Sequence, residues 1–230
     1  MNQPIWRPSP EKIDGSQLKD FMQASEICTG EQFEDYQAFW KWSVDNIPDF
    51  WDLVWNYTDV VGEKGERILI NQDDMLGARF FPDAQLNYAE TMLQKNDEDT
   101  AIIFRAEKGD DTKLSYAQLQ ESVSRWQQAL KACGVEKGSR VAGYMPNMPE
   151  TIIAMLACVS LGAIWASASP DFGEQGVIDR FGQIEPTVLV CVDGYYYNGK
   201  EIDCLEKVAA IQPALNGLKK TVVVPFIGEN

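Results

Sequence analysis

The second half of the chain alternates short apolar segments with longer amphipathic ones, and this alternation constrains the fold more than any other feature of the sequence. Strands that alternate with helices in this way, and that are apolar on both faces, form mostly parallel sheets covered by helices. We therefore predict an α/β fold for residues 96–230. The expected strands of this sheet are nearly continuous apolar runs, at 140–144, 163–168, 188–192 and 221–225.

Helix signals fill the segments between these strands. Ser115 followed by Gln118 is a capping-box pattern, and apolar residues recur at helical spacing after it until Gly134 ends the run. The segment 152–161 is apolar nearly all round, which is typical of a buried helix, and Asn147 is its expected cap. The remaining predictions are Pro149 at a first helical position, a helix capped by Asp171 with Glu174, a helix over 201–211, and a strand over 101–104 that turns at Asp110-Asp111 and returns at 113–114.

Residues 1–95 carry little strand pattern and look helical and irregular. Thr29 followed by Gln32 is expected to open a helix in which aromatic residues recur at helical spacing. A second short aromatic stripe follows over 50–55. We therefore predict a mainly helical N-terminal extension that docks through its aromatic residues onto a larger body, with its boundary at the acidic stretch 96–99.

Composition excludes several classes of function. The 230 residues include no histidine, which excludes a histidine-based catalytic triad and a histidine metal site. The formal net charge of −15 argues against nucleic acid and anionic membranes as partners. No apolar run reaches the roughly 18–20 residues of a membrane span, and no signal peptide is evident. The five cysteines are widely spaced and odd in number, which favours reduced thiols in a cytoplasmic protein.

The segment 194–200 matches the spacing G-x-x-x-x-G-K of a phosphate-binding loop, between an expected strand and an expected helix. That loop ends in Ser or Thr, whose hydroxyl binds Mg²⁺, whereas Glu201 stands here. We therefore interpret the segment as a turn, with Lys200 as a single phosphate contact as the alternative. There is no G-x-G-x-x-G, no G-x-S-x-G and no paired set of carboxylates, so the residues alone predict no catalytic or metal site.

Several motifs, in order, carry a resemblance to a known family. Trp6–Pro10 resembles the opening of acetoacetyl-CoA synthetases, and 179–186 with 193–195 points to the same branch. The other motifs resemble the wider acetyl-CoA synthetase group and the core motifs of adenylate-forming enzymes, at 78–82, 86–90, 114–119, 144–147, 162–165 and 169–173. The resemblance covers essentially the whole chain and implies the first α/β subdomain of the adenylate-forming fold after a helical N-terminal extension.

The resemblance implies a cytoplasmic ligase of lipid metabolism that needs ATP, Mg²⁺ and CoA. In such an enzyme acetoacetate and ATP give an acyl-adenylate and pyrophosphate, and CoA then displaces AMP to give acetoacetyl-CoA. The phosphate loop, the nucleotide contacts, the acyl pocket and the adenylation lysine of such enzymes have no counterpart in this sequence. We therefore expect an N-terminal fragment that is inactive without its C-terminal portion, holds no catalytic residue, and self-associates through exposed apolar surface.

The resemblance also implies which residues line the CoA nucleotide. These are Ser169, Pro170 and Asp171 in one loop, and Tyr197 and Lys200 after the next strand. Lys200 keeps a positive charge for a phosphate, and Tyr197 offers an aromatic face for the adenine. The alternatives are that these residues form only a turn and a cap, that the chain is a free-standing CoA- or nucleotide-binding module, or that it belongs to a sister acetyl- or propionyl-CoA synthetase.

Overall fold

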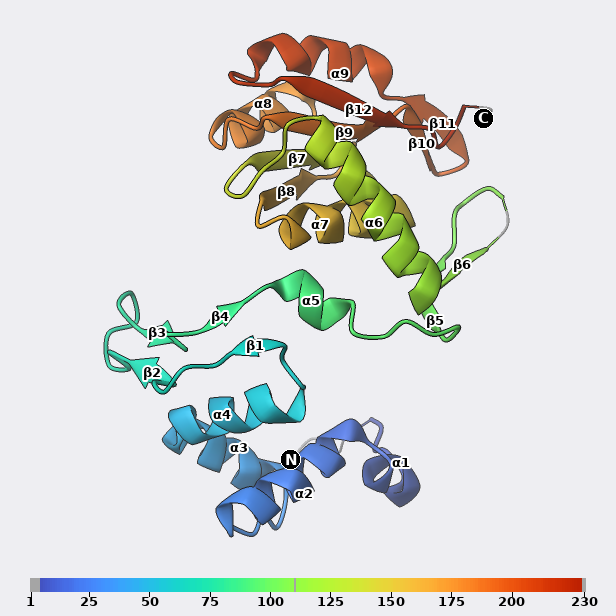
Figure 1. Ribbon diagram of the computed structural model, residues 1–230. Helices are drawn as coiled ribbons and strands as arrows, with labels where there is room; N and C mark the ends of the chain where they lie inside the picture. Colours follow the sequence, from blue (N-terminus) through green and yellow to red (C-terminus); the bar gives the residue numbers. More distant parts are fainter. Residues whose placement is uncertain (1–4, 110, 229–230) are drawn as a thin grey trace. The chain divides into compact units, whose positions relative to one another are not determined.

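The computed structural model describes residues 5–109 and 111–228, and the chain divides into two compact units, Met1–Leu86 and Asn87–Asn230 (Figure 1). The division comes before the boundary expected at the acidic stretch 96–99. Helix α5 (Tyr88–Met92) belongs to the second unit because the side chain of Asn87, its N-cap, donates to the carbonyl of Val159 at 3.0 Å and to that of Ser160 at 3.3 Å.

The first unit is mainly helical, as predicted. Its four strands are two residues long and form two small antiparallel pairs, β1 with β4 and β2 with β3. The elements are α1 (Pro10–Asp14), α2 (Gln17–Thr29), α3 (Tyr36–Asp45), α4 (Ile47–Tyr57), β1 (Gly62–Glu63), β2 (Leu69–Ile70), β3 (Arg79–Phe80) and β4 (Gln85–Leu86).

The predicted helix start at Thr29 is wrong. Thr29 is the last residue of α2, and Gly30 follows it in the left-handed region with φ 75°. Helix α3 begins later, where the Asp35 carboxylate accepts the N–H of Ala38 at 2.9 Å. An acceptor side chain ahead of free N–H groups of the first turn sets a helix start, and Asp35 has this role. The Thr29 hydroxyl accepts the N–H of Glu31 at 3.2 Å, but Glu31 is not in a helix.

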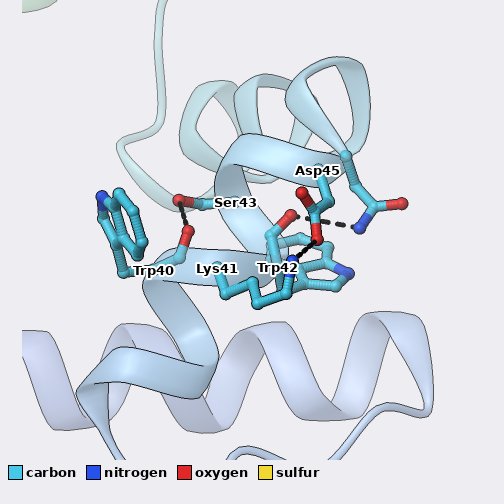
Figure 2. A network of polar contacts seen from close by, with 6 residues as sticks. Trp40, Lys41, Trp42, Ser43 and Asp45 are labelled. Atoms are coloured by element: carbon cyan, nitrogen blue, oxygen red, sulfur yellow. Dashed lines mark hydrogen bonds and ion pairs between the residues drawn. The ribbon is translucent and has the colours of Figure 1, made fainter.

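Helix α3 presents different aromatic residues to its two sides (Figure 2). Trp42 and Phe39 stack with their ring centroids 6.0 Å apart, in a cluster that also contains Phe21, Phe33 and Phe50. Trp40 lies on the other side of the helix and is 50% exposed, and its carbonyl accepts the hydroxyl of Ser43 at 2.8 Å. The aromatic residues of this unit therefore build a small core of their own.

The second unit is built on a four-stranded parallel sheet in the order β12-β9-β7-β8, which confirms the predicted α/β fold. Tyr144 of β7 pairs with Ala168 of β8 and with Cys191 of β9. Besides α5, the elements are β5 (Thr100–Phe104), β6 (Thr112–Ser115), α6 (Tyr116–Ala132), β7 (Arg140–Tyr144), α7 (Pro149–Ser160), β8 (Ile164–Ala168), α8 (Glu174–Gly182), β9 (Val188–Val192), β10 (Gly194–Tyr197), β11 (Lys200–Asp203), α9 (Leu205–Ile211), the 3₁₀ turn η1 (Gln212–Ala214) and β12 (Lys220–Val224).

Helices cover both faces of this sheet (Figure 1). Every residue of β9 is buried. Its alternate side chains enter two cores: Val190 packs in the cluster formed with α6 and α7, while Leu189 packs in the cluster formed with α8 and α9. Burial on both faces is the reason that this strand is apolar along its whole length.

Some of the helix starts and caps predicted for this unit are confirmed and others are wrong. The capping box is present, with the N–H of Ser115 donating to Gln118 at 2.9 Å and the N–H of Gln118 donating to Ser115 at 3.2 Å. Pro149 opens α7 as predicted, but its N-cap is Met148, so the expected cap at Asn147 is wrong. The strands β5 and β6 pair antiparallel as the returning segment predicted, and Asp110 of the expected turn lies outside the described residues.

Candidate functional site

The carboxyl ends of the four parallel strands meet at one edge of the sheet, and the candidate residues lie in the segments that follow them. Ligands of open α/β sheets bind in the crevice outside this edge. The segment after β8 is the loop 169–173, and the segment after β9 is Asp193 followed by the hairpin of β10 and β11. All five residues expected to contact CoA are in this loop and this hairpin.

The loop 169–173 is tied to the sheet by a tyrosine. The fully buried hydroxyl of Tyr144, at the end of β7, lies 2.8 Å from the carbonyl oxygens of both Pro170 and Phe172. The ammonium of Lys207, on α9, donates to the same Pro170 carbonyl at 3.1 Å. Burial raises the pKa of Tyr144 well above its ordinary value, and the charge of the neighbouring Cys204 thiolate would raise it further. The hydroxyl therefore stays protonated and donates.

The predicted contacts in this loop differ in their accessibility. Ser169 and Asp171 are exposed, whereas Pro170 is fully buried and meets the rest of the protein through its ring and carbonyl. The expectation that Asp171 caps the next helix is wrong, because α8 begins at Glu174 with Gly173 as its N-cap and with no side-chain cap. Asp171 is therefore free of the structural role that its sequence position suggested.

Tyr197 and Lys200 face each other at the end of a β-hairpin, not at the start of a helix. They are the last paired residues of β10 and β11, and Asn198-Gly199 forms the turn with φ 50° and 74°. The predicted helix over 201–211 is wrong in its first part, since β11 runs to Asp203 and α9 begins at Leu205. The Asn-Gly pair is a strong hairpin signal because both turn positions need positive φ, and the sequence analysis missed it.

The tip of this hairpin has no free amides for a phosphate. The N–H of Asn198 donates to Glu107 Oε1 at 3.0 Å and the N–H of Gly199 donates to Glu107 Oε2 at 2.9 Å. Lys108, next in the chain, places its ammonium 4.8 Å from the ring centroid of Tyr196. The structure therefore supports the interpretation of 194–200 as a turn and excludes a phosphate-wrapping loop.

Asp193, which lies between β9 and the hairpin, stabilises the same edge of the sheet. Its Oδ1 accepts the N–H groups of Gly194, Phe226 and Ile227 at 2.9, 2.7 and 3.1 Å, and its Oδ2 accepts that of Gly228 at 2.8 Å. Partial burial by itself would raise the pKa of this carboxyl, but the four backbone donors outweigh it and lower the pKa below its usual value. The carboxylate thus joins the end of β9 to the segment after β12.

The loop is linked to the helix that follows the hairpin, because Lys207 of α9 donates to the Pro170 carbonyl at 3.1 Å. Burial raises the pKa of Tyr195, at the base of the hairpin, and the nearby Cys204 thiol and Asp171 carboxylate raise it further. Ser169 and Asp171 are exposed in the loop after β8, and Tyr197 and Lys200 are exposed in the hairpin that follows β9, at the same edge of the sheet. The arrangement offers hydrogen-bonding groups, an aromatic face and one positive charge, which suit a nucleotide.

Two further properties concern metals and membranes. Within residues 5–109 and 111–228, no group of three or more Cys, Asp or Glu side chains is placed to hold a metal ion. No helix of the described ranges has the length and apolar character needed to cross a membrane.

Comparisons with known proteins match both units. Residues 89–229 match the family model described as "AMP-binding enzyme", and residues 36–92 match the one described as "Acetyl-coenzyme A synthetase N-terminus". The chain is 48% identical over 227 residues to an acetoacetyl-coenzyme A synthetase of Rhizobium meliloti (strain 1021), covering 99% of this chain and 35% of that protein. It is 36% identical over 227 residues to an acetoacetyl-CoA synthetase of Xenopus tropicalis, covering 97% and 34%.

A solved structure agrees with these matches. Acetoacetyl-CoA synthetase from Streptomyces lividans superposes with a TM-score of 0.91 at 36% identity, over 100% of this chain and 36% of that one. The chain therefore spans about a third of the length of the relatives that it matches.

Proposed function

The chain belongs to the family of AMP-binding enzymes, and from this premise we propose that it forms the N-terminal part of an acetoacetyl-CoA synthetase. The observation that carries the proposal is the 48% identity to such an enzyme along 99% of this chain. The similarity includes the helical first unit as well as the sheet, so it extends beyond the fold that many enzymes share.

The proposed reaction has two steps. The carboxylate of acetoacetate attacks ATP, giving acetoacetyl-AMP and pyrophosphate, and the thiol of CoA then attacks the adenylate, giving acetoacetyl-CoA and AMP. Mg²⁺ would accompany the ATP phosphates and neutralise their charge. Because the relatives are about three times as long, we assign the adenylation chemistry to the two thirds that lie outside the match.

The role proposed for this chain is to form one wall of the CoA site. Ser169 and Asp171 supply hydrogen-bonding groups, Lys200 supplies a positive charge for a phosphate, and Tyr197 supplies an aromatic face for the adenine. Tyr197 and Lys200 are both exposed and opposite each other in register, which supports this role. Pro170 contributes through its buried ring and its carbonyl, which anchor the loop.

A chimera tests this proposal directly. In the Rhizobium meliloti relative, the third that aligns with this chain is replaced by this chain, and the product is assayed with ATP, Mg²⁺ and CoA. We expect acetoacetate-dependent release of AMP and pyrophosphate by the chimera and none by the 230-residue chain alone. A folded chimera that adenylates acetate or propionate but not acetoacetate would assign the chain to a sister enzyme.

The second candidate function is a free-standing binding module. Calorimetry of the chain alone distinguishes this module from the N-terminal part of a synthetase. The support for the module is that loop 169–173 and the hairpin are formed within this chain. Titration with CoA and with ATP distinguishes the two, because a wall of a larger site should bind CoA weakly and ATP not at all. Tight ATP binding by the chain would overturn the proposal in favour of the module.

Two further proposals concern the oligomeric state of the chain and its location in the cell. Self-association of the 230-residue chain is supported by the outermost strands of the sheet, where Ile164 of β8 is 53% exposed and Val223 of β12 is 46% exposed. Light scattering across a concentration series tests it, and a constant monomer mass would refute it. A cytoplasmic location is supported by the five free thiols, and fractionation of cells expressing the tagged protein tests it.

A further inference from the structure

The loop 169–173 depends on side chains for its position. It leaves β8, an outermost strand of the four-stranded sheet, and leads into α8. Two backbone hydrogen bonds lie at its start, from the N–H of Met145 to Ala168 at 3.1 Å and from the N–H of Phe172 to Ser169 at 3.2 Å. The first ends before the loop and the second lies within it, so neither ties the middle of the loop to the sheet.

Tyr144 supplies that tie. Its side chain is fully buried in the core formed with α8 and α9, where it lies among Val177, Phe181 and Leu189. A hydroxyl held on a buried ring can approach the loop from only one direction. Its single proton is shared between two carbonyls at equal distance, those of Pro170 and Phe172, so the hydroxyl lies against both ends of a three-residue segment.

Two further side-chain contacts help to position the loop 169–173. Lys207 of α9 donates to the Pro170 carbonyl at 3.1 Å, so that carbonyl accepts from two separate elements. The guanidinium of Arg180, on α8, lies 4.2 Å from the ring centroid of Phe172. The bonds to carbonyls hold the inner side of the loop, which leaves the exposed side chains of Ser169 and Asp171 on the solvent side.

We propose that Tyr144 is a positioning residue for acyl transfer to CoA, which holds the loop 169–173 so that Ser169 and Asp171 meet the CoA nucleotide. The proposal rests on the proposed function. Tyr144 acts through backbone carbonyls and does not touch CoA, and Lys207 of α9 donates to the same Pro170 carbonyl. A residue with this role affects the step that uses CoA and leaves the formation of the adenylate unchanged, since that step precedes CoA.

The test compares the two half-reactions in the chimera. Tyr144→Phe removes the donor and keeps the ring, Lys207→Met removes the second donor, and Lys207→Arg restores a donor. Tyr116→Phe, at the start of α6, is the matched control. Acetoacetate-dependent exchange of pyrophosphate into ATP measures adenylation, and the KM for CoA in AMP release measures transfer. We expect Tyr144→Phe to raise the KM for CoA about tenfold, while the rate of pyrophosphate exchange into ATP stays within about twofold of the wild-type rate.

Hydrogen exchange of the segment 169–173 in the same variants shows whether the loop itself has loosened. We expect faster exchange in Tyr144→Phe and Lys207→Met, and wild-type behaviour in Lys207→Arg and Tyr116→Phe. An unchanged KM for CoA in both Tyr144→Phe and Lys207→Met would overturn the proposal, as would a raised KM with an unaltered loop. Absence of acetoacetate-dependent exchange in the unsubstituted chimera would instead refute the proposed function.

Discussion

The carboxylate of Glu107 closes the hairpin tip at Gly199, whose N–H lies 2.9 Å from Glu107 Oε2 although the two residues are 92 positions apart in the chain. The other oxygen accepts the N–H of Asn198 at 3.0 Å. Both amides of the turn are thereby satisfied by one side chain from the segment between β5 and β6. The hairpin that carries Tyr197 and Lys200 is held at its tip as well as along its strands.

Glu107→Ala should loosen this tip. Removal of the carboxylate leaves the two turn amides to water, so their hydrogen exchange should accelerate about tenfold while the exchange of β9 stays unchanged. Exchange measured by mass spectrometry on the 230-residue chain checks this. Glu201→Ala, which removes an exposed glutamate from the same hairpin, should leave the tip protected; equal acceleration in both variants would contradict the role of Glu107.

Lys200→Ala should weaken CoA without affecting ATP. An exposed ammonium contributes up to about 1 kcal/mol to a phosphate contact, so the KM for CoA of the chimera should rise about threefold to fivefold, and less at high salt. The KM for ATP should not change, because the segment 194–200 is a hairpin and not a phosphate loop. Lys200→Arg is the control that keeps the charge. A selective loss of ATP affinity in Lys200→Ala would contradict this expectation.

Asp193→Asn should destabilise the chain, and the effect should depend on pH. An amide cannot accept four backbone N–H groups as a carboxylate does, so we expect a loss of about 1–3 kcal/mol at neutral pH. The folded state holds the pKa of Asp193 below that of the unfolded chain, so the unfolded state binds the proton first as the pH falls.

The advantage of the wild type over Asp193→Asn is therefore fully present above about pH 4 and disappears as the pH falls through the lowered pKa. Urea unfolding at a series of pH values measures it. Glu136→Gln, at an exposed glutamate, is the control and should show little difference from wild type. A difference that grew on acidification would refute the sign of this linkage.

The cysteines should react with a thiol reagent in an order set by burial. Burial raises the pKa of Cys158 and of Cys191 to about 12, and that of Cys204 to about 11, so almost no thiolate forms at pH 8. Cys28 is exposed and should react first, followed by half-buried Cys133. Mass spectrometry of timed samples checks the order, and all five should react in guanidinium. Labelling of Cys204 as fast as Cys28 would show that the second unit opens.

Gly143→Ala should destabilise the second unit. A Cβ added to Gly143, on β7, would overlap the six-membered ring of Trp165 on the neighbouring strand β8. Such overpacking costs about 1–3 kcal/mol, which thermal unfolding would detect. Trp165→Leu in the same chain should recover part of the loss. Gly182→Ala is the control, because its Cβ also meets open space and its φ is not positive, so it should not destabilise the unit.

The sheet could be predicted from the sequence because its two central strands, β7 and β9, are buried on both faces. The expected strands 140–144 and 188–192 coincide with β7 and β9, since a doubly buried strand leaves a continuous apolar run. The capping box at Ser115 is equally local and was also found. The hairpin was not predicted because its strands, rich in tyrosine and charged residues, carry no run of aliphatic residues like that of a buried strand.

The sequence alone determined the alternation of strands and helices, the coverage of the sheet on both faces, and the resemblance that identifies the family. Only the tertiary structure showed which distant side chains fix the loop and the hairpin of the candidate site in place. Tyr144 reaches Pro170 across 26 positions, and Glu107 reaches Gly199 across 92. Apolar periodicity records which face of an element is buried, but a single hydrogen bond between distant segments leaves no periodic pattern, and its partners are set by how the chain packs.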